Sequence, residues 1–500
     1  MRLKNSMLKP LSSKDWDYAK AAHLLNRAGF GGPPAEIQKL ADLGLDKAVS
    51  SLLDYETIPD PAVDPVWAKP DPERMQKIRD MNQHGTPEEK RQFQQEEQRN
   101  QRERMMELRG WWLARMAKGP RPLQEKLVLF WHGHFATSVE KVRDAYFMWR
   151  QNDIFRRLAT GNWTLLLLEV GKDPAMLVWL DQAQSNRQHP NENFAREVME
   201  LFALGEGHYT EHDIGEAARA LTGWSLDRIN QEFISRPFAH DPGEKTFLGR
   251  TGNLDGEDVI AQIVAQPQAA KFITAKLWNY FAGQEPSEEL NEALAASFRA
   301  NGNNFKPFLD ALFHSGEFYS DTVIRNQVKS PVQWLVGSVR VLECELPPPL
   351  VNWGMLRQLG QDLFAPPNVK GWDGGVTWIT TNTLLERYND AQSLVQGTVP
   401  PLTANDYARK QGGAGGEKAM KMLQRLRMGG VNVEKILTPE ERADKNKIVT
   451  ALEHRLFQAA LNSGQQQTLR DFLDAKTNLS NADIVTTIRL MMSTPEYQVT

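Results

Sequence analysis

The segment that decides the fold of this 500-residue chain runs from His189 to Trp224 and reads HPNENFAREVMELFALGEGHYTEHDIGEAARALTGW. Its apolar residues recur at i, i+4, i+7 and i+8, which predicts one buried face of a helix: Phe194, Val198, Leu201 and Phe202. Gly205 and Gly207 are expected to end this helix. Thr210 and Asp213 then form the pattern of a capping box for a second helix that stops at Gly223. The segment therefore predicts two short helices joined by a glycine turn.

The first of these helices also carries a polar stripe. Glu192, Arg196 and Glu200 follow at steps of four, and Glu197 lies beside them. One interpretation is a solvated ladder of ion pairs, each contributing about 0.2–0.5 kcal/mol. The other is a set of carboxylates at the wall of a cleft, where Arg196 binds and Glu192 and Glu197 are catalytic. Two such carboxylates could also act as acid and base on a glycosidic bond.

Composition excludes several classes of protein. The net charge of −4 and the pI of about 6.3 give no field that attracts nucleic acid, so we expect no nucleic-acid partner. The single cysteine, Cys344, cannot form an internal disulfide or a cysteine-based zinc site. No apolar run approaches the ~20 residues of a membrane span. The N-terminus is basic but lacks an apolar core, so we expect a cytoplasmic chain as written.

Helical periodicity continues through most of the chain, and no alternating strand pattern of useful length occurs. We therefore predict an all-α fold: a large, irregular multi-helix domain with long ordered loops, a C-terminal helical extension and more than half of its residues helical. Thr86, Pro87 and Glu89 mark the start of a long, solvated helix that becomes buried near Met105. Continuous helices are expected over 138–158 and 257–282, and loops over 225–256.

This pattern divides the chain into four predicted segments. Residues 1–60 are N-terminal helices that pack on the core, and 61–120 form a polar insertion with the long solvated helix. Residues 121–395 are the main helical domain with the candidate site. Residues 396–500 are a linker, which includes the glycine-rich GGAGG, followed by C-terminal helices.

Several longer motifs resemble one known family. They are, in order, AHLLNRAGFGG (22–32), FWHGHFATS (130–138), NENFAREVMELFALG (191–205), YTEHDIGEAARALTGW (209–224), HDPGEKTFLG (240–249), KSPVQWLVGSVR (329–340) and GQDLFAPPNVKGWDGG (360–375). Their sequence and order are similar to those of the bacterial domain of unknown function 1800 family. The ending STPEY at 493–497 is similar as well.

The resemblance implies a bacterial, largely helical protein whose activity is not established. Many members of that family carry export signals. Many are encoded beside members of another uncharacterised family, number 1501, which resembles alkaline phosphatases. A phosphatase-like protein is therefore the partner that the resemblance implies. The polar segment 71–105 looks like an insertion relative to the family.

The HGH motif is the first candidate metal site. His132 and His134 would diverge on a regular helix, but Gly133 could end the helix and let the two imidazoles converge on a divalent metal. The alternative is that both are hydrogen-bonded core histidines, because each imidazole has a nitrogen that needs a partner.

The HDPG loop and a tryptophan-rich loop supply further candidates. His240 and Asp241 are potential catalytic groups, and Lys245 a potential anion contact, although Asp241 before Pro242 also fits a simple Asx turn. Trp372, in a Pro/Gly-rich loop, would stack on a sugar ring if exposed and would only anchor the loop if buried.

These residues support two hypotheses about function. The first is a hydrolase-like enzyme in a helix-lined cleft, using a His/carboxylate site and possibly a divalent metal. The alternative is a non-enzymatic helical scaffold, or a glycan- or protein-binding protein, that partners a phosphatase-like neighbour. The two differ in whether the HGH, NENFARE and HDPG motifs meet in an open cleft or lie inside a saturated hydrogen-bond network.

Overall fold

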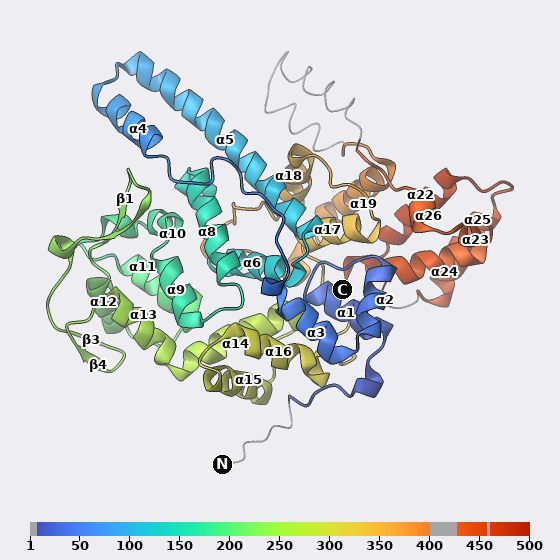
Figure 1. Ribbon diagram of the computed structural model, residues 1–500, viewed down its shortest axis with the longest axis horizontal. Helices are drawn as coiled ribbons and strands as arrows, with labels where there is room; N and C mark the ends of the chain where they lie inside the picture. Colours follow the sequence, from blue (N-terminus) through green and yellow to red (C-terminus); the bar gives the residue numbers. More distant parts are fainter. Residues whose placement is uncertain (1–7, 401–427, 458–460) are drawn as a thin grey trace.

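The computed structural model describes residues 8–400, 428–457 and 461–500 (Figure 1). The chain is 63% helical, and the described residues contain two small two-stranded sheets, so the predicted all-α class is confirmed. The glycine-rich linker falls largely on residues 401–427, outside the described ranges. Among the described residues, no helix is long and apolar enough to cross a membrane.

The chain begins with three short helices and continues into a projecting helical hairpin. The glycine cluster after the first helix ends it, as its breaker pattern predicts. The elements are α1 (Tyr18–Arg27), α2 (Pro34–Asp42), α3 (Leu45–Leu53), α4 (Pro72–His84) and α5 (Pro87–Lys118). Figure 1 shows α4 and the first half of α5 extending away from the body of the molecule.

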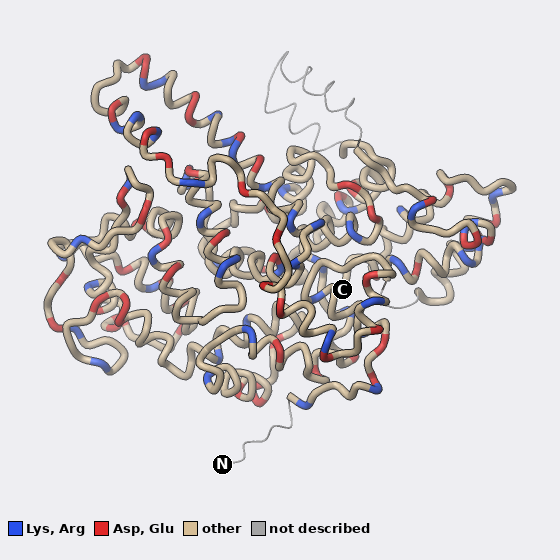
Figure 2. The backbone as a smooth tube through the Cα atoms, viewed as in Figure 1, with Lys and Arg blue, Asp and Glu red and all other residues tan. Residues whose placement is uncertain are grey.

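The projecting hairpin is polar because little of it packs on the core. Thr86 and Glu89 form the predicted capping box of α5, and its first buried residue is Met105. α4 has no buried residue. Lysine, arginine and acidic residues alternate along both helices (Figure 2). The prediction of a long helix that is solvated until Met105 is therefore confirmed.

Helix α6 (Pro122–His134) lies at the centre, and its polar residues are used to hold its neighbours. The carboxylate of Glu125 is 1% exposed. It accepts hydrogen bonds from Nε of Arg115 at 2.7 Å, from Nε of Arg156 at 2.8 Å and from the indole of Trp112 at 2.9 Å. Burial favours its neutral form, but Arg156 and Arg115 outweigh burial and hold the Glu125 pKa below its ordinary value.

The segment predicted as one helix over 138–158 is two helices, α7 (Val139–Val142) and α8 (Ala145–Arg157). Arg143 between them has φ of 56°, which interrupts the helical backbone. Asp144 then caps α8 by accepting the N–H groups of Tyr146 and Phe147. Helices α9 (Trp163–Gly171) and α10 (Pro174–Trp179) follow.

The quoted segment 189–224 contains the two predicted helices. The first is α11 (Glu192–Glu197), which continues as a π-helical turn over Val198–Ala203, and the second is α12 (Glu211–Ala220). Asn191 caps α11, and Thr210 with Asp213 forms the predicted capping box of α12.

Residues 225–256, predicted to be loops, contain two short antiparallel hairpins. Strand β1 (Trp224–Asp227) pairs with β2 (Glu232–Ser235), and β3 (Lys245–Phe247) pairs with β4 (Arg250–Gly252). Trp224 lies opposite Ser235 in the first hairpin. Each strand has only three or four residues, too few to show an alternating pattern.

The second half of the chain is again helical. The helix predicted over 257–282 is divided at Pro267, because a proline ring removes a backbone donor. The helices are α13 (Gly256–Ala265), α14 (Pro267–Ala282), α15 (Glu288–Ala300), α16 (Phe305–His314), α17 (Pro331–Val341), α18 (Pro349–Gln358), α19 (Thr381–Gln396), α22 (Val433–Ile436), α23 (Pro439–Arg442), α24 (Lys445–Leu456), α25 (Ser463–Asp474) and α26 (Asn481–Met492).

The buried apolar side chains form one connected cluster. It takes members from all four predicted segments, for example Leu24, Trp112, Phe194 and Ile448. The four segments thus share a hydrophobic core, and their boundaries as domains stay a prediction.

Candidate functional site

The NENFARE helix changes its winding in the middle. Leu204 N–H donates to the carbonyl of Met199, five residues earlier, at 2.7 Å, as in a π-helix. Gly205, with φ of 81°, ends the turn. Phe202 lies in the last turn of this helix, where carbonyls have no intrahelical partner, so its carbonyl is available to another helix. Single π turns occur often at functional sites.

His134 is the partner of that carbonyl. Its Nε2 donates to the oxygen of Phe202 at 2.9 Å, and the side chain is buried. The ring packs among aromatic side chains, with centroids at 4.5 Å from Phe135 and 5.8 Å from Phe130. Burial, and then the charge of Lys276, hold the His134 pKa well below its ordinary value. This imidazole is neutral and links α6 to the π turn.

His132 holds a different part of the chain. Its Nε2 accepts the backbone N–H of Phe364 at 3.0 Å, and its ring lies 5.6 Å from that of Trp372. Burial, and then the charge of Arg109, lower the His132 pKa to about 3. Gly371 has φ of 83°, and a Cβ there would lie 2.2 Å from the Gly133 oxygen. The tryptophan loop therefore rests directly on the HGH turn, and half-buried Trp372 helps to anchor it.

The two imidazoles do not bind a common partner. Within the described ranges, no group of three or more His, Cys, Asp or Glu side chains is arranged to hold a metal ion. The predicted divalent metal at His132 and His134 therefore has no support from the geometry.

The acidic stripe of α11 faces solvent and α12. Arg196 donates two hydrogen bonds to the carboxylate of Glu211, at 2.9 and 2.7 Å, and the two side chains are 35% and 77% exposed. Glu200 accepts from the hydroxyl of Tyr209 at 2.7 Å. Glu192 is exposed and has no hydrogen bond or ion pair with any residue that the structure describes.

Glu197 is a glutamate of the stripe whose pKa is raised. Its side chain is half-buried. Burial, and then the charge of Glu200, raise the Glu197 pKa, while Arg196 and Lys370 act in the opposite direction. Lys370 belongs to the tryptophan-rich loop, and its effect on the Glu197 pKa means that this loop lies near the stripe.

The HDPG loop folds onto α12. Asp241 accepts from Nε of Arg219 at 2.8 Å and from the N–H of Gly243 at 2.8 Å, which is the Asx-type turn. The Arg219 hydrogen bond holds the Asp241 pKa below its ordinary value. Nδ1 of His240 lies 3.0 Å from the carbonyl of Thr222.

Lys245, predicted as an anion contact, is 1% exposed. Its Nζ donates to the carbonyls of Asp241 at 2.7 Å and Gly243 at 2.9 Å, so the ammonium closes the turn. Burial lowers the Lys245 pKa.

The contacts of these motifs form two groups. The HGH turn contacts the π turn of α11 and the loop 361–373, whereas the HDPG loop contacts α12. Among the described residues, no hydrogen bond connects the HDPG loop to the HGH turn or to the NENFARE helix. The roles predicted for Glu192, Glu197, His240 and Asp241 in catalysis stay predictions.

A family model described as "Protein of unknown function (DUF1800)" matches residues 23–499. The chain belongs to this family. The match extends the resemblance carried by the motifs to nearly the whole chain. No curated protein and no solved structure matches the chain. Family membership therefore gives no activity, and the function has to be argued from the surfaces and cavities.

The first such feature is a groove of about 720 Å³ between α4 and the β1–β2 hairpin. α4 contributes Met75 and Ile78, and the hairpin contributes Leu226 and Ile234. Sequence analysis did not find this groove, because its two walls lie about 150 residues apart in the chain and meet only in the folded protein.

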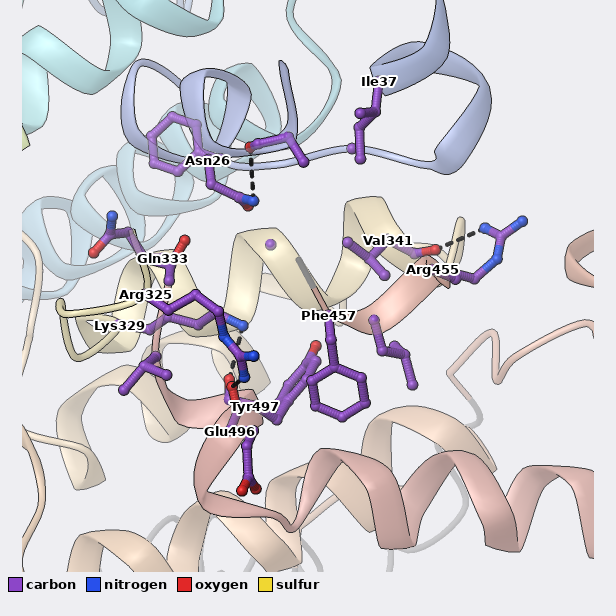
Figure 3. Close-up of a pocket in the computed structure, with 17 residues that line it drawn as sticks. Asn26, Ile37, Arg325, Lys329, Gln333, Val341, Arg455, Phe457, Glu496 and Tyr497 are labelled. Carbon is purple, nitrogen blue, oxygen red and sulfur yellow. Dashed lines mark hydrogen bonds between the residues drawn. The ribbon is translucent and has the colours of Figure 1, made fainter. Parts of the chain in front are cut away.

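The second feature is a small pocket lined by basic residues (Figure 3). Arg325, Lys329 and Arg455 line it, together with Glu496 and Tyr497. Two family motifs, KSPVQW and STPEY, meet here. That meeting is the signal that sequence analysis could have used, because both motifs are conspicuous in the chain but have no assigned role.

Proposed function

We propose that this protein is a helical binding protein that holds an acidic, amphipathic segment of a partner protein in the groove between α4 and the β1–β2 hairpin. The observation that carries the proposal is the combination of apolar walls and unpaired arginines in one open groove. A groove that accepts the apolar face of a segment is a common mode of peptide recognition.

The apolar walls supply the area that binding needs. Met75 and Ile78 face the groove from one side, and Leu226, Ile229 and Ile234 face it from the other. Leu226 is 3% exposed and the other four are half-buried, so they offer part of their apolar surface in one concave place, as is typical of interaction sites.

The charges of the groove favour an acidic partner. Arg79, Arg228 and Arg236 line it, and none of them has an ion pair with a residue that the structure describes. The single acidic lining residue, Asp227, accepts the N–H groups of Ile229 at 2.9 Å and Asn230 at 3.2 Å, which closes the hairpin turn, and it also feels the charge of Arg236. Complementary charge would steer an acidic segment and fix its orientation.

Gln231, in the turn of the β1–β2 hairpin, holds the two walls of the groove together. This side chain is 0% exposed, and its backbone has φ of 58°. Its Oε1 accepts the N–H of Asp71, at the start of α4, at 2.8 Å, and its carbonyl accepts from Arg150 of α8 at 3.0 Å. Arg74 of α4 pairs with Asp144 at 3.1 Å. Because both walls are tied to α8, binding requires little ordering of the groove.

The test reverses the charge of the three arginines that line the groove and measures which of two oppositely charged peptides binds. The probes are two labelled helical peptides with leucine on one face and either glutamate or lysine on the other, measured by fluorescence polarisation. Wild-type protein should bind the glutamate peptide. The triple variant Arg79→Glu, Arg228→Glu, Arg236→Glu should prefer the lysine peptide. Arg102→Glu, on exposed α5 outside the groove, is the matched control and should behave as wild type.

Equal binding of both peptides, or a triple variant with wild-type preference, would overturn the proposal. The phosphatase-like neighbour that the family resemblance implies is the first natural partner to test. Its binding should show the same dependence on the three arginines and should weaken as salt rises, because exposed charges are screened.

A hydrolase centred on Glu197 is the second candidate. Its pKa is raised by burial and by the charge of Glu200, and a glutamate with a raised pKa beside a second carboxylate can act as the acid of an acid–base pair. It requires that turnover of a substrate be lost in Glu197→Gln. The same variant should leave peptide binding in the groove unchanged, so the two functions are distinguishable.

A further inference from the structure

The basic pocket lies where distant parts of the chain meet. α1 contributes Asn26, the segment before α17 contributes Arg325 and Lys329, and the segment after α26 contributes Glu496 and Tyr497 (Figure 3). The pocket encloses about 40 Å³, which is room for about three water molecules at roughly 10–15 Å³ each. Its size fits a small polar group and not a large molecule.

Lys329 is the first of two cations with unused hydrogen-bonding capacity. Its Nζ donates to the carbonyl of Tyr497 at 2.7 Å and lies 4.0 Å from the centre of that ring. An ammonium has three donors, and the other two have no partner among the described residues. Burial, and then the charges of Arg387 and Arg325, lower the Lys329 pKa to about 7. Burial and the two neighbouring arginines thus disfavour the charged form of this lysine.

Arg325 is the second cation. The one hydrogen bond of its guanidinium within the described ranges is a long one, 3.4 Å from Nη2 to the carbonyl of Glu496. Its backbone has φ of 60°, a conformation that is unfavourable for a residue with a side chain and often retained at functional sites. The fold therefore keeps a guanidinium at the pocket wall without pairing it with a carboxylate.

The acidic residue of the lining, Glu496, forms no ion pair with Lys329 or Arg325, although its charge opposes the lowering of the Arg325 pKa by burial. One carboxylate oxygen of Glu496 accepts from Nε2 of Gln465 at 2.8 Å. In Figure 3 this carboxylate points away from the Arg325 guanidinium. The third cation, Arg455, is already satisfied by the carbonyls of Val341 and Ile436 and by the Glu343 carboxylate. Lys329 and Arg325 thus line the pocket with hydrogen-bond donors that the described residues do not use.

We propose that this pocket binds a small oxyanion, a phosphate or carboxylate group, between Nζ of Lys329 and the guanidinium of Arg325. Both cations are half-buried and have unused donors, and an oxyanion would accept charge-assisted hydrogen bonds from both groups. Phe30, Ile37 and Phe457 form an apolar side that limits the ligand to a small group. This site is independent of the groove, since the two share no lining residue.

The experiment is isothermal titration of the full chain with inorganic phosphate and, separately, with acetate. Binding of one or both supports the proposal, and their relative affinity identifies the anion class. Lys329→Gln and Arg325→Gln should each weaken binding at least about ten-fold, the value of one lost charge-assisted bond. Lys14→Gln, which changes an exposed lysine outside the pocket, is the matched control and should bind as wild type.

The variants Lys329→Arg and Arg325→Lys retain the charge and should retain binding, which separates loss of the anion from loss of the fold. The proposal fails if neither anion binds the wild-type protein. It also fails if folded Lys329→Gln and Arg325→Gln bind as tightly as wild type, since the anion would then be held elsewhere.

Discussion

Two arginine–carboxylate groups in this protein have similar geometry and different surroundings. Arg115 and Arg156 hold Glu125 at 2.7 and 2.8 Å, and Arg196 holds Glu211 at 2.9 and 2.7 Å. The side chain of Glu125 is 2% exposed, whereas that of Glu211 is 77% exposed. Water competes for the second pair and is excluded from the first. Bond lengths alone therefore do not indicate what an ion pair contributes.

The same division separates the polar motifs of the chain. The histidines of the HGH turn resemble Glu125, because they are buried and each ties a separate segment to α6. The acidic stripe of α11 resembles the Arg196–Glu211 pair, because most of it faces solvent. Removing a group of the first kind leaves an unpaired partner inside the protein, and removing one of the second kind leaves its partner to water.

The largest effect is expected for Glu125→Ala. It leaves buried Arg156 without a carboxylate and Arg115 with Asp60 alone, which should lower the free energy of unfolding by about 3–5 kcal/mol. Urea denaturation measures the change. Glu289→Ala, which removes an exposed glutamate of α15, is the control and should have no effect. If Glu125→Ala were as stable as the control, burial would not make the Glu125 network contribute more to stability than the exposed Arg196–Glu211 pair.

An intermediate effect, dependent on pH, is expected at His132. Its folded pKa of about 3 is depressed below the unfolded value of roughly 6.5, so between these values only the unfolded chain binds the proton. Its contribution to stability is complete above about pH 6.5 and is lost as pH falls, at about 1.4 kcal/mol per pH unit.

His132→Gln tests this contribution, because glutamine offers an oxygen to the Phe364 N–H but does not titrate. Urea unfolding of both proteins over a pH series should give a shallower loss of stability for the variant as pH falls from about 6 to about 4. If the stability of the two proteins fell in parallel with pH, His132 would be protonated in the folded protein. It could then not accept the Phe364 N–H at Nε2.

The smallest effect is expected for Arg196→Ala. Its partner Glu211 is solvent-exposed, and exposed pairs contribute little to stability. The thermal midpoint should equal that of the wild type, and Glu211→Ala should behave in the same way. A clear fall in either midpoint would place this pair with the buried group and would sharpen the comparison in the opposite direction.

The sequence by itself determined the local elements of this protein. The capping boxes at Thr86 and Thr210 follow from it, because each depends on hydrogen bonds between residues three positions apart. The all-α class follows from apolar spacing in the same way. The sequence did not decide between histidines that bind a metal and histidines that form hydrogen bonds in the core. It therefore did not predict the hydrogen bond between His132 and the backbone of Phe364.

The tertiary structure decided the features that depend on residues far apart in the chain. The division at Arg143, the π turn before Leu204 and the positive φ of Gln231 depend on packing and not on local spacing. The groove joins α4 to residues near 230, and the basic pocket joins Lys329 to Tyr497. Burial sets whether a charged group is structural, exposed or available to a ligand, and burial is a property of the folded chain.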